Sequence, residues 1–116
     1  KVCEVWGTGQ AKREYMHVDD CVKGILYANN FIDDGTIINI APGIEMTTLA
    51  TAEIISKIIG FKGKLILDHS KPDGTPRKLA NGKKIMDLGW EGPKINFENG
   101  LEATYKWYLE NIYHNN

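Results

Sequence analysis

Three short apolar segments alternate with longer segments of helical periodicity, and this order limits the chain to one class of fold. The strand-like segments are Val2–Trp6, Thr36–Ile40 and Lys64–Asp68. A glycine turn follows the first, and Pro42-Gly43 follows the second. Strands separated by helices predict an α/β chain, but three strands are too few for an independent doubly wound sheet.

The spacing of apolar residues also predicts about four helices. An acidic residue is expected to cap the first one. Gly24 lies inside that helix and weakens it by about 1 kcal/mol relative to alanine. The helices are expected after Asp19 or Asp20, from Thr47 to Gly60, around Ile85 to Leu88 with an end at Gly89, and after Asn96.

The composition is that of a folded globular chain. Its 116 residues are 42% hydrophobic and 25% charged, which is ordinary for a globular domain and too apolar for a disordered one. The net charge of −1 argues against a nucleic-acid-binding module, since such modules carry a surplus of basic residues. No apolar run approaches the roughly 18 residues that cross a bilayer, so we expect no membrane partner.

The cysteines indicate the cellular compartment, and the first residues indicate whether the chain is part of a longer polypeptide. Cys3 and Cys21 are too few for a disulfide framework and lack the spacing of a zinc site, so we expect reduced thiols in a cytoplasmic protein. The chain begins at Lys1, and its first residues predict a strand rather than a targeting leader. We therefore expect one domain, or part of one, from a longer polypeptide.

Two basic segments are the candidate functional sites. Glycines let a backbone approach a ligand closely, arginine grips phosphate oxygens through two nitrogens, and lysine adds a point charge. A carboxylate on a rigid turn can accept hydrogen bonds from sugar hydroxyls. The combination suits a nucleotide diphosphate sugar, and two solvated surface loops are the alternative. The segments are Trp6-Gly7-Thr8-Gly9 with Lys12 and Arg13, and Lys71, Arg77 and Lys78 around Pro72-Asp73-Gly74-Thr75-Pro76.

The spacing disfavours other chemistry. The turn Gly7–Gly9 is not a dinucleotide-binding motif, because that motif needs a third glycine where this chain has Lys12. The run from His17 to Asp20 contains metal-ligand residue types, but a helix N-terminus explains its carboxylates, so we expect no metal. Nothing in the sequence places Cys3 beside His17 as a nucleophile and its base.

The segment from Val5 to Asp20 resembles the second half of extended short-chain dehydrogenase/reductases, which have a Rossmann-type fold. The loop from Asp68 to Leu79 is more particular. Together with later motifs it resembles the GDP-L-fucose synthase branch, and the likeness covers about residues 2–111. The motifs are Val5-Trp6-Gly7-Thr8-Gly9, Arg13-Glu14-Tyr15, His17-Val18-Asp19-Asp20, Ser70-Lys71-Pro72-Asp73-Gly74-Thr75-Pro76-Arg77-Lys78, Leu88-Gly89-Trp90 and Thr104-Tyr105-x-Trp107-Tyr108.

This resemblance implies a role for the whole chain. Residues 1–116 would be the C-terminal substrate-binding region of an NADPH-dependent enzyme. That enzyme epimerises C3 and C5 of GDP-4-keto-6-deoxy-D-mannose and reduces C4 to give GDP-L-fucose. Substrate contacts would fall on Trp6, Arg13, Asp73 and Lys78. Arg13 would hold the diphosphate, Lys78 would lie near the nucleotide, Asp73 would orient the GDP-sugar, and Trp6 would pack against the ligand.

The resemblance also implies what this chain lacks. The family's glycine-rich cofactor motif and its catalytic residues precede the position where the chain begins. We therefore expect no catalytic or cofactor-binding residue here and no reductase activity from the chain alone. NADPH and a homodimer interface would belong to an N-terminal part. Without that part, apolar faces with Val22, Leu26, Ile38 and Ile40 would be exposed, which predicts self-association or loose packing.

Two alternatives stay open at this point. One is another nucleotide-sugar epimerase or dehydratase of the same superfamily, which the preferred nucleobase would distinguish. The other is a nucleotide-sugar-binding module without chemistry.

Overall fold

A computed structural model describes residues 1–113 of the chain. It has the expected α/β character, with few strands and four α-helices followed by one π-helical turn. The predicted fold class is confirmed. In chain order the elements are β1 (Val2–Trp6), β2 (Lys12–Glu14), α1 (Val18–Asn29), β3 (Glu45–Thr47), α2 (Thr48–Ile58), β4 (Lys64–Asp68), α3 (Lys83–Asp87), α4 (Phe97–Tyr108) and η1 (Leu109–Tyr113).

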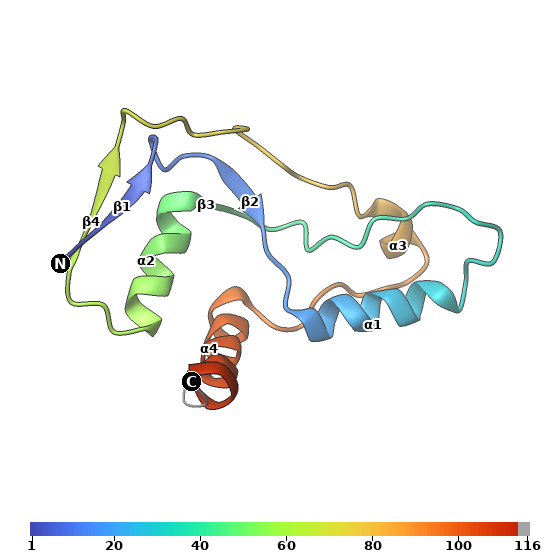
Figure 1. Ribbon diagram of the computed structural model, residues 1–116. Coiled ribbons are helices and arrows are strands. Elements are labelled where there is room, and N and C mark those ends of the chain that lie inside the picture. Colours follow the sequence, from blue (N-terminus) through green and yellow to red (C-terminus); the bar gives the residue numbers. More distant parts are fainter. Residues whose placement is uncertain (114–116) are drawn as a thin grey trace.

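The strands form two separate pairs. Strands β1 and β4 are parallel, in a register that runs from Val2 opposite Lys64 to Trp6 opposite Asp68. Helix α2 lies beside this pair (Figure 1). Strands β2 and β3 are antiparallel. They were not predicted, because each has only three residues, too few to show an alternating pattern.

The predicted strand Thr36–Ile40 is wrong, since the structure has no regular element there. A strand is defined by pairing, and no described segment lies alongside these residues as a partner in a sheet. The apolar residues are used differently. Ile38 and Ile40 pack against a small core of Ala28, Ile85 and Trp90 at the α1 and α3 end of the molecule.

The first turn of α1 also differs from its prediction. His17 caps the helix in place of Asp19 or Asp20, because its Nδ1 accepts a hydrogen bond from the Asp19 backbone N–H at 3.2 Å. Asp20 is instead 1% exposed, and its Oδ2 accepts hydrogen bonds from the backbone N–H groups of Lys94 and Ile95. This buried carboxylate joins α1 to the segment that leads into α4.

Two other predicted helix N-caps are confirmed, whereas α2 and α3 end one or two residues before the glycines predicted to end them. The Thr47 side chain caps α2 by accepting a hydrogen bond from the Ala50 backbone N–H. The Asn96 side chain caps α4 in the same way through the Asn99 N–H. These side chains satisfy backbone donors that the first turn of a helix leaves without partners.

The molecule is elongated, and its two packed ends are joined by the β2–β3 ribbon (Figure 1). Its radius of gyration is 17.1 Å, whereas a compact chain of this length has about 13 Å. Among residues 1–113, six hydrophobic side chains are buried. Within the same range, no helix is both long and apolar enough to cross a membrane.

Candidate functional site

The residues from Ser70 to Lys78, called here the 70–78 loop, leave β4 and run over β2 toward α3 (Figure 1). Pro72 and Pro76 prevent a regular helix or strand, as expected. The loop is nevertheless tied to β2. The Lys12 N–H donates to the Pro76 carbonyl at 2.9 Å, and the Lys78 N–H donates to the Lys12 carbonyl at 3.4 Å.

Asp73 joins this loop to the glycine turn after β1. Its Oδ1 accepts from the Thr8 backbone N–H at 2.7 Å, and its Oδ2 accepts from the Thr8 hydroxyl at 2.8 Å. Gly7 has a φ of +77°, and a Cβ at that position would collide with the Asp73 carboxylate. The turn therefore needs glycine for its backbone and for the close approach of Asp73.

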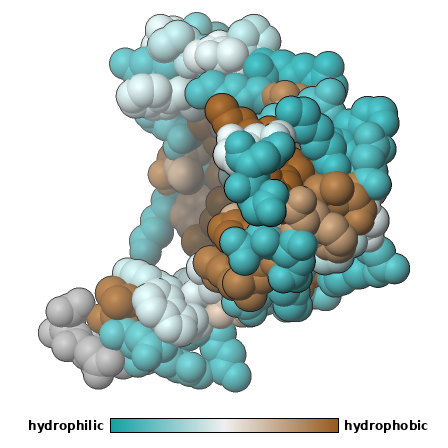
Figure 2. Space-filling view, turned by 90° about the vertical axis from the view of Figure 1, so that its right-hand side faces the viewer, coloured by the Kyte–Doolittle hydropathy of each residue, from teal (hydrophilic) through white to brown (hydrophobic). Residues whose placement is uncertain are grey.

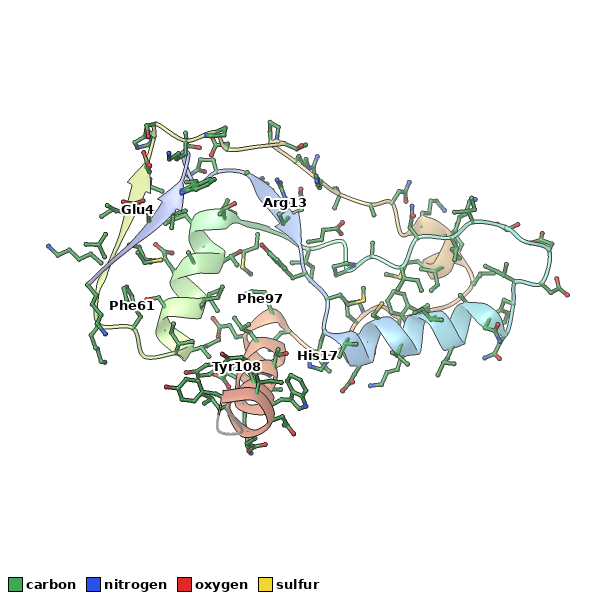
Figure 3. All side chains as sticks on the ribbon, in the orientation of Figure 1. Glu4, Arg13, His17, Phe61, Phe97 and Tyr108 are labelled. Atoms are coloured by element: carbon green, nitrogen blue, oxygen red, sulfur yellow. The ribbon has the colours of Figure 1, made fainter. Side chains whose placement is uncertain are left out.

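Arg13 lies on β2 beneath the loop (Figure 3). Its Nη1 donates to the Lys12 carbonyl at 2.6 Å and to the Thr75 carbonyl at 2.8 Å. These two bonds orient the guanidinium toward the loop. Among the described contacts, they leave Nε and Nη2 as the donors that a phosphate could use.

Arg77 belongs to the predicted basic segment but is paired within the protein. Its Nε and Nη2 donate to the two carboxylate oxygens of Glu45 at 2.7 and 2.6 Å. The hydrogen bond from Arg77 lowers the pKa of Glu45 below its ordinary value, and the same bond raises the pKa of Arg77. This two-bond pair fixes the end of the loop to β3, so Arg77 is a structural cation here.

Arg13 and Lys78 are 65 positions apart in the sequence, yet they line the same open hollow of about 440 Å³. Glu14, Leu79 and Ala80 complete its lining. Arg13 and Lys78 are two of the four predicted substrate contacts. The hydrogen bonds between the loop and β2 bring them to the same hollow.

Trp6 and Asp73 lie at the other end of the loop. Trp6 is 60% exposed, and the Lys71 ammonium lies 5.7 Å from the centre of its ring. This is within the range of a cation–π interaction. Trp6 therefore offers an exposed aromatic surface beside the positive charge of Lys71. It lies next to the glycine turn, which the Thr8–Asp73 hydrogen bonds join to the 70–78 loop.

Sequence reasoning did not foresee which residues hold the site together. Thr8 lies in a candidate segment but had no role assigned, and Glu14 and Glu45 were not candidates. The hydrogen-bond partners of these three residues are 29 to 66 positions away along the chain. Glu14 follows the predicted ligand Arg13 directly, and this adjacency was the one available signal. The residues around Glu45 in the sequence do not predict its role, because Glu45 binds Arg77, which is 32 positions away along the chain.

Other candidate chemistry is not assembled in the described part of the chain. Residues 1–113 contain no group of three His, Cys, Asp or Glu side chains that could hold a metal. Both cysteines are free thiols. His17 caps α1 and packs against Gly100 of α4, so it lies away from the two basic segments (Figure 3).

Comparisons with known proteins show which proteins this chain is similar to. A model of the NAD dependent epimerase/dehydratase family matches residues 1–41. A probable GDP-L-fucose synthase 1 from Oryza sativa subsp. japonica is 44% identical over 108 residues, which make up 93% of this chain and 33% of that protein. The chain spans about a third of the length of the curated relatives it matches.

Solved structures share the fold. A GDP-mannoheptose C4 reductase from Campylobacter jejuni with NADP bound is 33% identical and has a TM-score of 0.77, covering 93% of this chain and 35% of that one. A GDP-L-fucose synthetase from Naegleria fowleri has a TM-score of 0.87 at 24% identity, covering 95% of this chain and 34% of that one.

Proposed function

Because this chain is a relative of the GDP-L-fucose synthases over most of its length, we propose that residues 1–116 form the substrate-binding part of an enzyme of that kind. The complete protein would epimerise C3 and C5 of GDP-4-keto-6-deoxy-D-mannose and reduce C4 with NADPH. The observation that carries this proposal is the placement of Arg13 and Lys78 in one hollow.

The proposed part of this chain is to bind and orient the GDP-sugar. Arg13 would hold the diphosphate with the guanidinium edge that does not bind Thr75, and Lys78 would add a second positive charge. The exposed ring of Trp6 would pack against the ligand. Asp73 would act at the sugar or, through Thr8, on the position of the loop. Fixing the substrate's orientation lowers the barrier to reaction.

The residues here do not fit the cofactor. The turn Gly7–Gly9 is followed by strand β2 rather than a helix, so it presents no helix N-terminus to a pyrophosphate. Its close side is occupied by Asp73, a carboxylate that would repel phosphate. We therefore assign NADPH binding to another part of a complete cytoplasmic protein. By resemblance to the family, the catalytic residues and a homodimer interface would also belong to that part. On this proposal the chain alone has no reductase activity.

The test is calorimetric titration of the complete protein with GDP, with UDP, ADP and dTDP as competitors for the same site. We expect GDP to be preferred. The variants Arg13→Ala and Lys78→Ala should each weaken GDP binding about tenfold or more, since each removes a charge-assisted contact worth about 1.5–3 kcal/mol.

Two variants make the result interpretable. Lys57→Ala removes an exposed lysine from α2 and should leave GDP binding unchanged. Arg13→Lys keeps the charge without the planar fork and should bind with intermediate strength. Equal binding of all four nucleotides would favour another nucleotide-sugar enzyme, and unchanged GDP affinity in both alanine variants would refute the proposed site.

A further inference from the structure

Glu14 accepts hydrogen bonds from two backbone N–H groups that are far away along the chain, both from Glu14 and from each other. Its Oε1 accepts from the Gly43 backbone N–H at 2.9 Å, and its Oε2 accepts from the Ala80 backbone N–H at 2.7 Å. Glu14 ends β2, whereas Gly43 and Ala80 both lie in segments without regular structure. One carboxylate therefore ties two irregular segments to the ribbon.

The bond to Ala80 bears on the hollow described above. Arg13 and Glu14 form one wall of it, and Lys78, Leu79 and Ala80 form the other. The Ala80 amide joins these walls, two residues beyond Lys78. Since a lysine side chain is long and flexible, the position of its backbone decides whether its ammonium can reach the same anion as Arg13.

The charge of Glu14 argues for the same role. A carboxylate beside a bound diphosphate would repel it, but here each oxygen already accepts a backbone N–H. The Glu14 carboxylate thus lies in the wall of the hollow, with both oxygens bonded to the backbone. Glu14 therefore holds the backbone in place and does not itself bind the substrate.

We propose that Glu14 is a positioning residue for the diphosphate of the substrate, acting through the Ala80 amide to hold Lys78 opposite Arg13. This inference rests on the proposed function and extends it to a residue that does not touch the ligand.

The test compares Glu14→Gln with the parent protein for binding of GDP and of inorganic pyrophosphate. Glutamine keeps the shape of the side chain but replaces one acceptor oxygen by an amide N–H₂ that faces a backbone donor. We expect both affinities to fall by about fivefold or more. Guanosine, which has no phosphate, should bind the variant and the parent equally, and a general loss of folding would not produce this difference.

Two further variants sharpen the comparison. Glu53→Gln makes the same chemical change at an exposed position of α2 and should alter neither affinity. Glu14→Asp keeps the charge, but its side chain is shorter by one methylene group and the carboxylate lies farther from the two backbone N–H groups. We therefore expect it to bind GDP and pyrophosphate more weakly, as Glu14→Gln does. Parent-like pyrophosphate binding by Glu14→Asp would show that charge alone matters and would overturn a positioning role.

The outcomes separate this inference from the proposed function. If Arg13→Ala and Lys78→Ala leave GDP binding unchanged, the proposed site itself is wrong. If both weaken binding while Glu14→Gln binds pyrophosphate like the parent, the site stands and the role of Glu14 is refuted.

Discussion

The charged residues of the 70–78 loop differ in function according to their partners. Arg77 uses two nitrogens on Glu45 and holds the loop against β3. Lys78, the next residue, lines the same hollow as Arg13. A basic sequence can supply either kind of residue, because arginine and lysine bind an internal carboxylate as readily as an external phosphate. The folded position of Glu45 decides between the two uses.

The Glu45–Arg77 pair predicts a pH dependence of the loop. The folded-state pKa of Glu45 lies below its ordinary 4.5, first because of the hydrogen bond from Arg77. A lowered pKa means that the pair stabilises the folded loop fully above about pH 4.5 and loses this effect as the pH falls through the folded-state pKa. An NMR titration of the Glu45 carboxyl should show the low midpoint.

The variant Arg77→Gln is the control for this titration. It removes the charge and the two-bond pair, so the midpoint of Glu45 should rise toward 4.5. Equal midpoints in the parent and the variant would show that the pair does not form in solution.

At the scale of elements, α1 shows why a helix can contain a glycine although glycine has a low helix propensity. Gly24 faces the small core, and a Cβ there would lie 2.7 Å from Cγ2 of Ile40 and 3.2 Å from Cζ2 of Trp90. The absence of a side chain lets the helix approach these residues closely. The segment 36–40, which has no strand partner, is held in part by this contact.

The variant Gly24→Ala sets two effects against each other. Alanine favours the helix by about 1 kcal/mol, while forcing a methyl group into a packed contact costs about 1–3 kcal/mol. Since the contact with Ile40 is closer than real Cβ contacts allow, we expect a net loss of free energy of unfolding, measured by urea denaturation.

Lys23→Ala is the matched control in the same helix, because Lys23 is exposed. Its effect should lie within about 0.5 kcal/mol of zero. A Gly24→Ala variant more stable than the parent would mean that helix propensity outweighs packing at this position.

At the scale of the whole molecule, the chain leaves a large surface uncovered. Its accessible area is 8322 Å², whereas a compact protein of its mass of 13.0 kDa exposes roughly 6300 Å². Part of the excess is one apolar face of α1, at the end of the molecule that Figure 2 shows with hydrophobic residues among polar ones. The exposed residues of this face are Val18, Val22, Ile25 and Leu26.

The sequence-based expectation for this face is met in part. Val22 and Leu26 are exposed, as anticipated, but Ile38 and Ile40 pack against the small core. We therefore place the predicted self-association on α1. A stable interface buries about 800 Å² per partner, so the α1 face would have to act together with neighbouring exposed surface.

Sedimentation velocity at increasing concentration tests this prediction on the 116-residue chain. The average mass of the parent should rise with concentration, and Leu26→Lys should reduce that rise. Val2→Lys is the matched control, because Val2 is 60% exposed and Leu26 is 61% exposed. Their elements, β1 and α1, lie at opposite ends of the molecule (Figure 1). A parent chain that stays monomeric throughout would contradict the prediction.

Local chemistry explains what could be predicted without the structure. Thr47 and Asn96 cap helices because their side chains reach the nearby backbone N–H groups, an interaction that spans three residues. The strands Val2–Trp6 and Lys64–Asp68 follow from runs of β-forming residues. The resemblance to the GDP-L-fucose synthases also came from contiguous motifs, and the comparisons confirm it.

The sequence by itself thus determined the α/β class, the helices and the two basic segments, since each depends on residues close together in the chain. Only the tertiary structure decided that Arg13 and Lys78 share a hollow, that Arg77 is taken up by Glu45, and that residues 36–40 do not form a strand. Each of these depends on a partner tens of positions away or, for residues 36–40, on the absence of a pairing partner among residues 1–113. Hydrogen bonds and strand pairing form only where folding brings both groups within about 3 Å of each other.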